Sequence, residues 1–565
     1  MNIKEIRFKL GLTQQQCAEF LNLSRRAYQY LETGDYDTNS EKYIFYCQKL
    51  ESYGQKASIS FNTSVVLGDN LHLTIETIKN YKKRFCYNSL LFYLNSDVDK
   101  VCILYGLRRT GKTTMLFQAL NDIDNSKAAY IKVKESDNMS MLIKDINILK
   151  DKGYKYLFID EITLMEDFIN SAATLSDIYC KLGMKIVLSG TDSLGFAFAD
   201  RDELYDRNIM IHTSYISFKE FSYILGINDV DQYIEYGGTF KIENMNLGDV
   251  DSKNDEVAFR DDESTRKYID TAISRNIQRS LRNNHFGSSF ASLRELHENN
   301  ELTNAINRII DNMNHDFLLG VFLNKYKSSD LGSSRQLLLQ SSNPAIQTAL
   351  YDINEAKVIK KMKEILDIKE KEELTANITN DVIHQIKTYL KMLDLIKEIP
   401  VVYDDGHVEQ RVIFTQPGMR YAITKSLVFS LMNDQYFASL SEKEKEIIIE
   451  KILGDVKGRM LEDIVLLETS LSLKSDYKVF KYISYQYGEV DMVIYHNNTF
   501  KTYEIKHSDK IVYDSQTKFL NNIEINKILK EKYGQLKSKY VVYNGETMLE
   551  KDVEYLNVSQ YLKSL

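Results

Sequence analysis

A glycine-rich segment, "GLRRTGKTT", occupies residues 106–114 and follows the apolar run "VCILY". The order of strand, glycine-rich loop and apolar helix is typical of a phosphate-binding loop, because glycines let backbone N–H groups close on phosphate oxygens. Lys112 is spaced to reach the β- and γ-phosphates of a nucleotide, and the Thr113 hydroxyl to ligate Mg²⁺. The sequence therefore predicts a site for ATP and Mg²⁺ formed by Gly106, Arg109, Thr110, Gly111, Lys112, Thr113 and Thr114.

A second element of the same chemistry is the buried-strand run "YKYLFIDE", which ends in Asp160 and Glu161. Asp160 at the end of a strand can complete the Mg²⁺ shell with Thr113, and Glu161 can orient the attacking water, so hydrolysis is predicted rather than binding alone. The alternative for Glu161 is a solvated charge at the strand end. The next strand, "KIVLSGTDS" (185–193), offers three polar residues that could sense the γ-phosphate: Ser189, Thr191 and Asp192.

Near the other end of the chain, "GEVDMVIYHNNTFKTYEIKHS" (488–508) predicts a hairpin that turns at Asn497-Asn498. This register places Asp491 opposite Glu504, and like charges that face each other repel unless a cation lies between them. Lys506 shares the face of Glu504 and could orient a water against a phosphodiester, with Mg²⁺ stabilising the developing charge.

An upstream helix, "GRMLEDIVLLETSL", offers Glu462 as a further metal ligand, and Glu468 as a less favoured one. The same hairpin register leaves a plainer alternative open, because Lys506 also faces Glu489 and could form an ordinary cross-strand ion pair. The sequence thus predicts a metal site of Glu462, Asp491 and Glu504 with Lys506 beside it, against solvated carboxylates at a sheet edge.

The first 55 residues contain two short helical patterns separated by a tight break. Thr13 and Ser24 are suited to cap these helices, and Asn22 tolerates the left-handed backbone of a turn. On the second helix the apolar residues point inward and a polar set remains outside. A helix-turn-helix module of this kind places its second helix in the major groove of DNA. The alternative is a protein-interaction module, because basic and acidic residues are equal in number here. The predicted DNA contacts are Gln14, Arg25, Arg26, Gln29 and Tyr30.

These residues must be positioned by regular elements. Further strands are predicted at 128–133 and 209–216, and strands alternate with helical patterns from residue 101 onward. This alternation favours a parallel sheet with its site at the carboxyl ends of the strands.

The wording "GLRRTGKTT", "LFIDEI", "VLSGTDS" and "YISFKEF" resembles one clade of bacterial and archaeal AAA-type ATPases. That resemblance implies an arginine just before the last strand, a position that Arg207 fits as a finger or sensor. Asp206 stands where the clade usually has glycine, and Arg201 and Arg275 are rival candidates. It also implies a helical lid and then a winged-helix-like segment, which could contact DNA or relay changes between domains.

The N-terminal residues resemble the Cro-type helix-turn-helix family, with Asn22 in place of the usual glycine. The resemblance implies that Gln14 lies against phosphate and that Arg25, Arg26 and Tyr30 face base edges. The C-terminal hairpin is similar to the PD-(D/E)xK nuclease fold, in which an acid on one strand precedes Glu-x-Lys on the next. Gln516 matches a glutamine often found after that core.

The predicted fold class is an α/β multidomain protein, with most of the 565 residues in five units. These are an all-α helix-turn-helix domain (1–55), a parallel-sheet P-loop ATPase (62–225), a helical lid with a loop insertion (226–340), a winged-helix-like segment (341–430) and an α/β restriction-endonuclease-like domain (431–565).

The formal charge of −8 gives no bulk signal for nucleic acid, so DNA contacts must come from local patches. No apolar run approaches a membrane span and the N-terminus lacks a signal-peptide core, so we expect a cytoplasmic protein without a membrane partner. We expect a DNA-binding ATPase that couples its nucleotide state to a nuclease-like domain, possible as a homo-oligomer and suited to stress or phage defence. One alternative is an ATP-dependent transcriptional regulator whose C-terminal domain binds without cutting, and another is a protein-interaction ATPase without a DNA partner.

Overall fold

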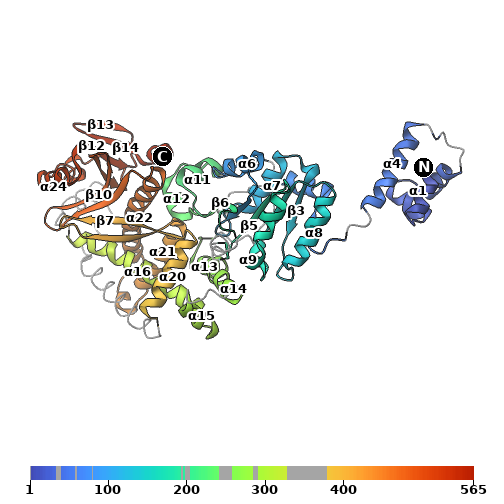
Figure 1. Cartoon of the computed structure of the whole chain (residues 1–565). Coiled ribbons are helices and arrows are strands. Elements are labelled where there is room, and N and C mark those ends of the chain that lie inside the picture. Colours follow the sequence, from blue (N-terminus) through green and yellow to red (C-terminus); the bar gives the residue numbers. More distant parts are fainter. Residues whose placement is uncertain are drawn as a thin grey trace.

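The computed structural model contains three bodies along the chain (Figure 1). It describes residues 2–33, 38, 40–56, 60–78, 80–191, 195–196, 204–240, 258–283, 290–327 and 378–565. A small helical body at the N-terminus lies apart from the rest, a body around a six-stranded sheet occupies the middle, and a body around an eight-stranded sheet holds the C-terminus. Among these residues, every helix is too short or too polar to cross a bilayer.

The N-terminal body consists of α1 (Ile3–Lys9), α2 (Gln14–Phe20), α3 (Arg25–Glu32) and α4 (Glu41–Lys56). The predicted caps are present: Thr13 and Gln16 form a capping box on α2, and the Ser24 side chain accepts the N–H of Ala27 at the start of α3. Asn22 has a φ of 55° in the turn between them, as predicted. Tyr28 and Leu31 of α3 are buried, which leaves the polar face of this helix outside.

The middle sheet has the strand order β1-β3-β4-β5-β2-β6. Its strands are β1 (Ser64–Val66), β2 (Val101–Tyr105), β3 (Ala128–Lys132), β4 (Tyr156–Asp160), β5 (Lys185–Gly190) and β6 (Asn208–His212). All neighbours pair in parallel except β1, which is antiparallel to β3. The parallel sheet predicted from the alternation of strands and helices is therefore confirmed, and its strands end at one common edge.

Successive side chains of each strand point to opposite faces of this sheet, and helices cover both faces. Cys102 and Leu104 of β2 pack with α5 (Gly68–Glu76), α6 (Tyr87–Asn95) and α7 (Lys112–Asp122). Val101 and Ile103 pack on the other face with α8 (Met139–Asp151) and the segment from α9 (Phe168–Ser171) to η3 (Leu175–Cys180).

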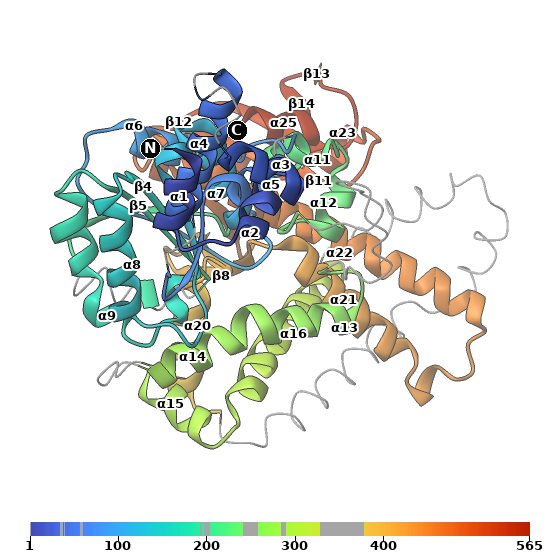
Figure 2. The same ribbon diagram turned by 90° about the vertical axis from the view of Figure 1, so that its right-hand side faces the viewer.

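Helices connect the two sheets. α11 (Phe218–Leu225) and α12 (Val230–Tyr236) follow β6 directly, and both lie beside the C-terminal body in Figure 1. The remaining helices of this region gather in the lower half of Figure 2: α13 (Asp262–Ile269), η4 (Asp270–Ser274), α14 (Arg275–Asn283), α15 (Ala291–Glu298), α16 (Leu302–Lys327) and α20 (Asn380–Met392). α21 (Pro417–Met432) packs between α12 and the long helix α22 (Glu442–Ser472) in one shared core.

The C-terminal sheet has the strand order β13-β14-β12-β11-β10-β9-β7-β8. Its strands are β7 (Ile396–Tyr403), β8 (Val408–Phe414), β9 (Lys478–Ser484), β10 (Gly488–His496), β11 (Thr499–Lys506), β12 (Gln535–Tyr543), β13 (Met548–Glu550) and β14 (Val553–Asn557). α22 and α25 (Val558–Ser564) pack on one face, and α24 (Ile523–Tyr533) on the other. α23 (Tyr513–Gln516) lies between β11 and α24.

The eight-stranded sheet includes strands on both sides of the boundary predicted at residues 430 and 431. β7 pairs in parallel with β9, so the hairpin of β7 and β8, which falls in the predicted winged-helix-like segment, extends the C-terminal sheet. The reason is a pairing between strands far apart in sequence, which local hydrophobic patterns do not reveal.

Candidate nucleotide site and carboxylate cluster

The glycine-rich loop lies between β2 and α7, at the carboxyl edge of the middle sheet. Gly106 has a φ of 151°, and a Cβ at this position would lie 2.5 Å from the Thr213 hydroxyl at the end of β6. Gly111 has a φ of 86° and stands at the N-cap of α7. The loop therefore needs glycine at both positions, one for close approach and one for its left-handed backbone.

Lys112 points back into the loop. Its ammonium donates to the carbonyl oxygens of Gly106 and Leu107, each at 2.8 Å. Burial lowers the pKa of Lys112 to about 8, although the charges of Glu161 and Asp160 oppose the shift. A buried ammonium whose hydrogen-bond acceptors are only neutral carbonyls is suited to donate to phosphate oxygens instead.

Asp160 at the end of β4 is the acceptor for four side chains. Its carboxylate accepts from the Thr113 hydroxyl at 3.1 Å and from the Ser189 hydroxyl. Tyr130 and Lys132 of β3 complete the set at 2.8 and 3.1 Å. Burial opposes its charge, yet the hydrogen bond from Ser189 and the charge of Lys132 hold the pKa of Asp160 below its usual range. Thr113 and Asp160 thus lie together, as a shared Mg²⁺ ligand pair requires.

Glu161 follows Asp160 and has a φ of 61°. A left-handed backbone in a residue other than glycine costs roughly 1 kcal/mol or more, and such strain is concentrated at functional sites. The residue therefore occupies a constrained position beside the predicted Mg²⁺ pair.

Arg84, which lies in none of the predicted motifs, links this loop to its neighbouring elements. Its guanidinium donates to the carbonyl oxygens of Thr110 (2.8 Å), Thr213 (2.6 Å) and Tyr215 (2.8 Å). It also forms a bidentate pair with Glu220 of α11 at 3.0 and 2.6 Å. The loop, the end of β6 and α11 are therefore held by one buried side chain.

The arginine predicted as a finger does not face this site. Arg207 precedes β6, and its carbonyl accepts the N–H of Val101 at the start of β2, on the sheet edge opposite the loop. Its guanidinium contacts Asp177 at 2.9 Å. Arg207 therefore lies away from the chain's own glycine-rich loop, because the parallel strands put residues before β6 and after β2 at opposite edges. Its role as a finger stays a prediction.

Of the two rival arginines, only Arg275 lies within the described residues. Arg275 is exposed and precedes Asn276, whose amide donates to the Thr191 carbonyl at 3.3 Å. Asp192 and Arg201 lie outside the described residues.

In the N-terminal body, the predicted DNA contacts lie on one side. Arg25, Arg26, Gln29 and Tyr30 are exposed on α3. The Gln14 side chain donates to Glu32 at 2.7 Å and accepts from Gln29 at 3.1 Å. Gln14 thus links α2 to α3.

The C-terminal hairpin has the predicted register. Met492 pairs with Tyr503, and Asn497 and Asn498 form the turn with φ values of 47° and 57°. Beyond this pair, a β-bulge between Val490 and Val493 interrupts the pairing of β10 with β9. The Asp491 carboxylate accepts the Ile505 N–H at 2.9 Å. A bulge re-aims a side chain, and here it turns Asp491 toward the backbone of β11.

Lys506 contacts the predicted acids rather than Glu489. Its ammonium lies 2.7 Å from Glu504 and 3.5 Å from Asp491. Burial and the charge of Asp491 hold the pKa of Glu504 well above its usual range. Burial opposes the charge of Lys506, but the two carboxylates hold the pKa of Lys506 above its usual value. Asp491, Glu504 and Lys506 thus form one buried group.

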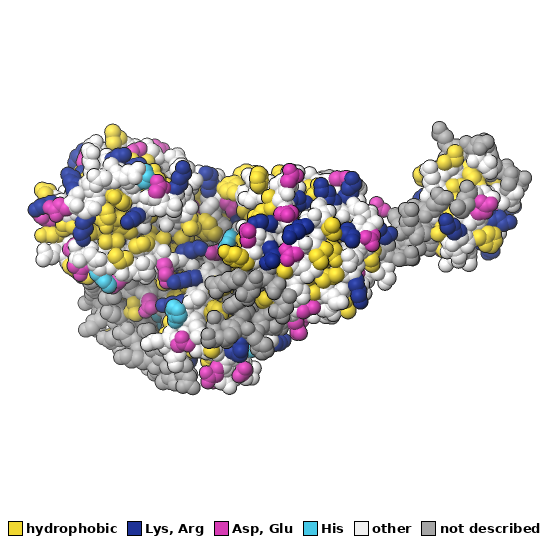
Figure 3. Space-filling view, viewed as in Figure 1, with side chains coloured by type: hydrophobic (Ala, Val, Ile, Leu, Met, Phe, Trp, Pro, Cys, Tyr) yellow, Lys and Arg dark blue, Asp and Glu magenta, His cyan; other side chains and the backbone are white. Residues whose placement is uncertain are grey.

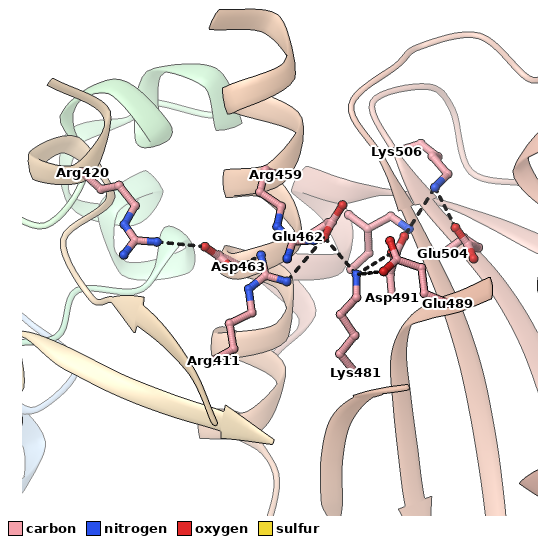
Figure 4. Close-up of polar contacts among 11 residues, drawn as sticks. Arg411, Arg420, Arg459, Glu462, Asp463, Lys481, Glu489, Asp491, Glu504 and Lys506 are labelled. Atoms are coloured by element: carbon pink, nitrogen blue, oxygen red, sulfur yellow. Dashed lines mark hydrogen bonds and ion pairs between the residues drawn. The ribbon is translucent and has the colours of Figure 1, made fainter. Parts of the chain in front are cut away.

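Glu462 of α22 is linked to this buried group by Lys481, a residue that no sequence motif indicated. The Lys481 ammonium lies 3.4 Å from both Glu462 and Asp491, and 3.2 Å from Glu489 (Figure 4). Glu462 also contacts Arg459 at 2.6 Å and Arg411 at 3.5 Å. Among the described residues, no three His, Cys, Asp or Glu side chains are placed to hold a metal ion.

The two remaining candidates lie elsewhere. Gln516 donates to the Lys510 carbonyl and accepts the Val512 N–H, so its side chain bonds to the backbone of the segment just before it. Glu468 is buried between α22 and α11, where its Oε1 accepts the Phe218 N–H at 2.6 Å. Burial raises the pKa of Glu468 to about 7, although that hydrogen bond opposes the shift.

Replacing Glu468 by glutamine is expected to stabilise the protein at pH 8 by about 3 kcal/mol, and by under about 1 kcal/mol at pH 5. The raised pKa means that the folded state keeps a proton that the unfolded state releases above its ordinary pKa of 4.5. Wild-type stability therefore falls as the pH rises from 4.5 through 7, and the variant lacks this loss. Urea unfolding followed by circular dichroism measures the difference. Glu450→Gln, on an exposed position of α22, serves as the control, and equal gains at both pH values would contradict the assignment.

Comparisons with known proteins show what this chain is similar to. A family model described as an AAA domain matches residues 98–222. An uncharacterized protein of Methanocaldococcus jannaschii is 26% identical over 212 residues, 34% of this chain, and the chain spans only 46% of that relative. The solved structure of the Aeropyrum pernix ORC1 protein in complex with DNA matches 64% of this chain and 95% of its own, at 13% identity and a TM-score of 0.21. Residues 98–222 of this chain are thus an AAA-type P-loop ATPase domain.

Proposed function

We propose that this protein hydrolyses ATP in its AAA domain and that its nucleotide state controls how it engages DNA. The observation that carries the proposal is the meeting of Lys112, Thr113, Asp160 and Glu161 at one edge of the sheet. Mg²⁺, when bound, would neutralise phosphate charge, and Thr113 and Asp160 are the residues that would hold it. Lys112 holds the phosphates, and Glu161 orients the attacking water.

Two buried contacts support coupling between the nucleotide site and the C-terminal body. Arg84 joins the loop carbonyl of Thr110 to Glu220 of α11. The first turn of the same helix is held by Glu468 of α22, the helix that also carries Glu462. A shift of the loop on nucleotide binding would therefore reach α22 through α11 as a rigid element.

DNA engagement is proposed for the exposed face of α3. Figure 3 shows basic and acidic side chains interspersed over the face in view, without one broad basic stripe. Arg25 and Arg26 lie in the first turn of α3, the end of a recognition helix that contacts base edges, and support the proposal as two exposed cations.

ATP turnover measured with and without duplex DNA tests this proposal. We expect DNA to stimulate turnover, and the double variant Arg25→Glu/Arg26→Glu to lose the stimulation while its basal turnover stays unchanged. Lys4→Glu/Lys9→Glu makes the same charge change on exposed positions of α1 and is the matched control. Loss of stimulation in both double variants would indicate bulk charge, and turnover indifferent to DNA in the wild type would favour an ATPase with a protein partner.

A second candidate function is cleavage of a phosphodiester by the C-terminal body. The favouring observation is that Glu462, Asp491, Glu504 and Lys506 converge from α22, β10 and β11. The residues do not present an open Mg²⁺ site in this arrangement, because Lys481 lies between Glu462 and Asp491. Cleavage would therefore require a rearranged state, such as one produced by nucleotide binding.

Cleavage of duplex DNA and of RNA in Mg²⁺, with and without ATP, tests the second candidate. We expect cleavage in one nucleotide state and its loss in Glu504→Gln, because the amide cannot act as a charged ligand. Glu524→Gln, at the exposed start of α24, is the control. If no nucleotide state supports cleavage, the C-terminal body is left with the role of binding nucleic acid without cutting, as in an ATP-dependent regulator.

A further inference from the structure

Lys481 occupies the centre of the carboxylate cluster. It lies in the middle of β9 and is 1% exposed. Its ammonium is within 3.4 Å of carboxylates from two different elements, Glu462 on α22 and Asp491 on β10, and 3.2 Å from Glu489. Figure 4 shows these side chains pointing toward the lysine from either side. A buried ammonium with three carboxylates around it makes the contacts that a divalent ion would otherwise make.

The connected network has no excess of negative charge that would call for a further cation. Each acid is in contact with at least one base, and the two kinds are equal in number. The acids are Glu462, Asp463, Glu489, Asp491 and Glu504, and the bases are Arg411, Arg420, Arg459, Lys481 and Lys506. A divalent cation added beside Lys481 would bring uncompensated positive charge into a buried site, which is strongly unfavourable.

We infer that Lys481 is the resident cation of this cluster, and that it keeps divalent metal ions out of the C-terminal site as long as its ammonium stays between Glu462 and Asp491. The role is that of a built-in counter-ion. It holds α22 against the β9–β10 pair and blocks the position from which a metal would contact both carboxylates.

Mn²⁺ binding to the full-length, nucleotide-free protein tests this inference, measured by isothermal titration calorimetry. The first comparison is between the wild type and Asp491→Asn. With Lys481 in place the two should bind the same number of Mn²⁺ ions. A smaller number for Asp491→Asn would overturn the inference, because it would show that the wild-type cluster holds metal despite the lysine.

The second comparison removes the ammonium while keeping the aliphatic stem. Lys481→Met should bind one additional Mn²⁺, at least about tenfold more tightly than any wild-type binding at this cluster, because ligand charge sets the affinity of such sites. Lys481→Met/Asp491→Asn should lose that ion again. Lys478→Met, on an outer position of the same strand, should bind as the wild type does. No additional ion in Lys481→Met would overturn the inference.

A second variant covers the case in which Lys481→Met does not fold, because it leaves buried carboxylates with fewer counter-ions. Lys481→Gln retains a hydrogen-bond donor and should likewise gain one ion, with a Mn²⁺-dependent rise in melting temperature that the wild type lacks. The inference rests on the proposed C-terminal site but not on cleavage. If the variants gain metal and the protein still cuts nothing, the cleavage proposal fails and the role of Lys481 stands.

Discussion

Replacing Lys112 by alanine is expected to lower ATP turnover by about 100- to 1,000-fold, the cost of removing one preorganised group that stabilises a developing phosphate charge. The ammonium of Lys112 is held by two loop carbonyls 2.8 Å away, and these neutral acceptors leave it ready for phosphate oxygens. Alanine removes the one charged side chain in the first turn of α7. Release of phosphate from ATP at saturating concentration measures the effect.

The control for this prediction is Lys127→Ala, an exposed lysine of the same domain that should change turnover less than twofold, as is usual for surface substitutions without buried partners. Binding of a fluorescent ATP analogue separates two ways of losing turnover. We expect weaker binding in Lys112→Ala as well as slower hydrolysis, because the lysine contacts both bound nucleotide and transition state. Unchanged turnover in Lys112→Ala would mean that the glycine-rich loop is not the hydrolytic site.

Replacing Arg84 by alanine is expected to destabilise the AAA domain by about 3–5 kcal/mol, the cost of leaving a buried charge without its partner. Arg84 and Glu220 are 6% and 4% exposed and face each other at 2.6 Å. The substitution also removes the hydrogen-bond donor of the Thr110, Thr213 and Tyr215 carbonyls. Chemical unfolding measures the loss, and ATP affinity should fall with it because Thr110 belongs to the loop.

Two further variants decide whether the buried pair is the cause. Arg84→Met/Glu220→Leu removes both charges and should recover part of the lost stability, because an apolar pair of similar volume avoids the unpaired carboxylate. Lys83→Ala removes a neighbouring surface pair with Asp122 and should cost less than about 1 kcal/mol. If Arg84→Ala lowered the free energy of unfolding as little as Lys83→Ala does, the stabilising role of the buried pair would be contradicted.

Local features were predictable because they depend on neighbours in sequence. The phosphate loop, its glycines and the acidic end of β4 follow from residue types at fixed spacing. The caps at Thr13 and Ser24 and the turn at Asn497-Asn498 follow from side chains that bond to their own backbone. The hairpin turn also set the register that brings Asp491 near Glu504, since one residue of slip would turn every side chain to the other face.

Features that join distant segments were not predictable in this way. Arg84 lies outside every motif, and its partners belong to the loop, β6 and α11. Arg207 has the sequence position of a finger, but strand order puts it at the edge of the sheet away from the nucleotide site. The same reason applies to β7, whose partner β9 follows only after α21 and α22.

The sequence by itself thus determined a phosphate-binding ATPase core and a hairpin carrying two acids and a lysine. Only the tertiary structure decided what surrounds those acids. Glu462 lies near them, but Lys481 of the neighbouring strand β9 lies between Glu462 and Asp491. The physical reason is that a pattern such as Asp…Glu-x-Lys specifies which ligands are present, whereas the net charge of a buried cluster depends on every chain segment packed around it.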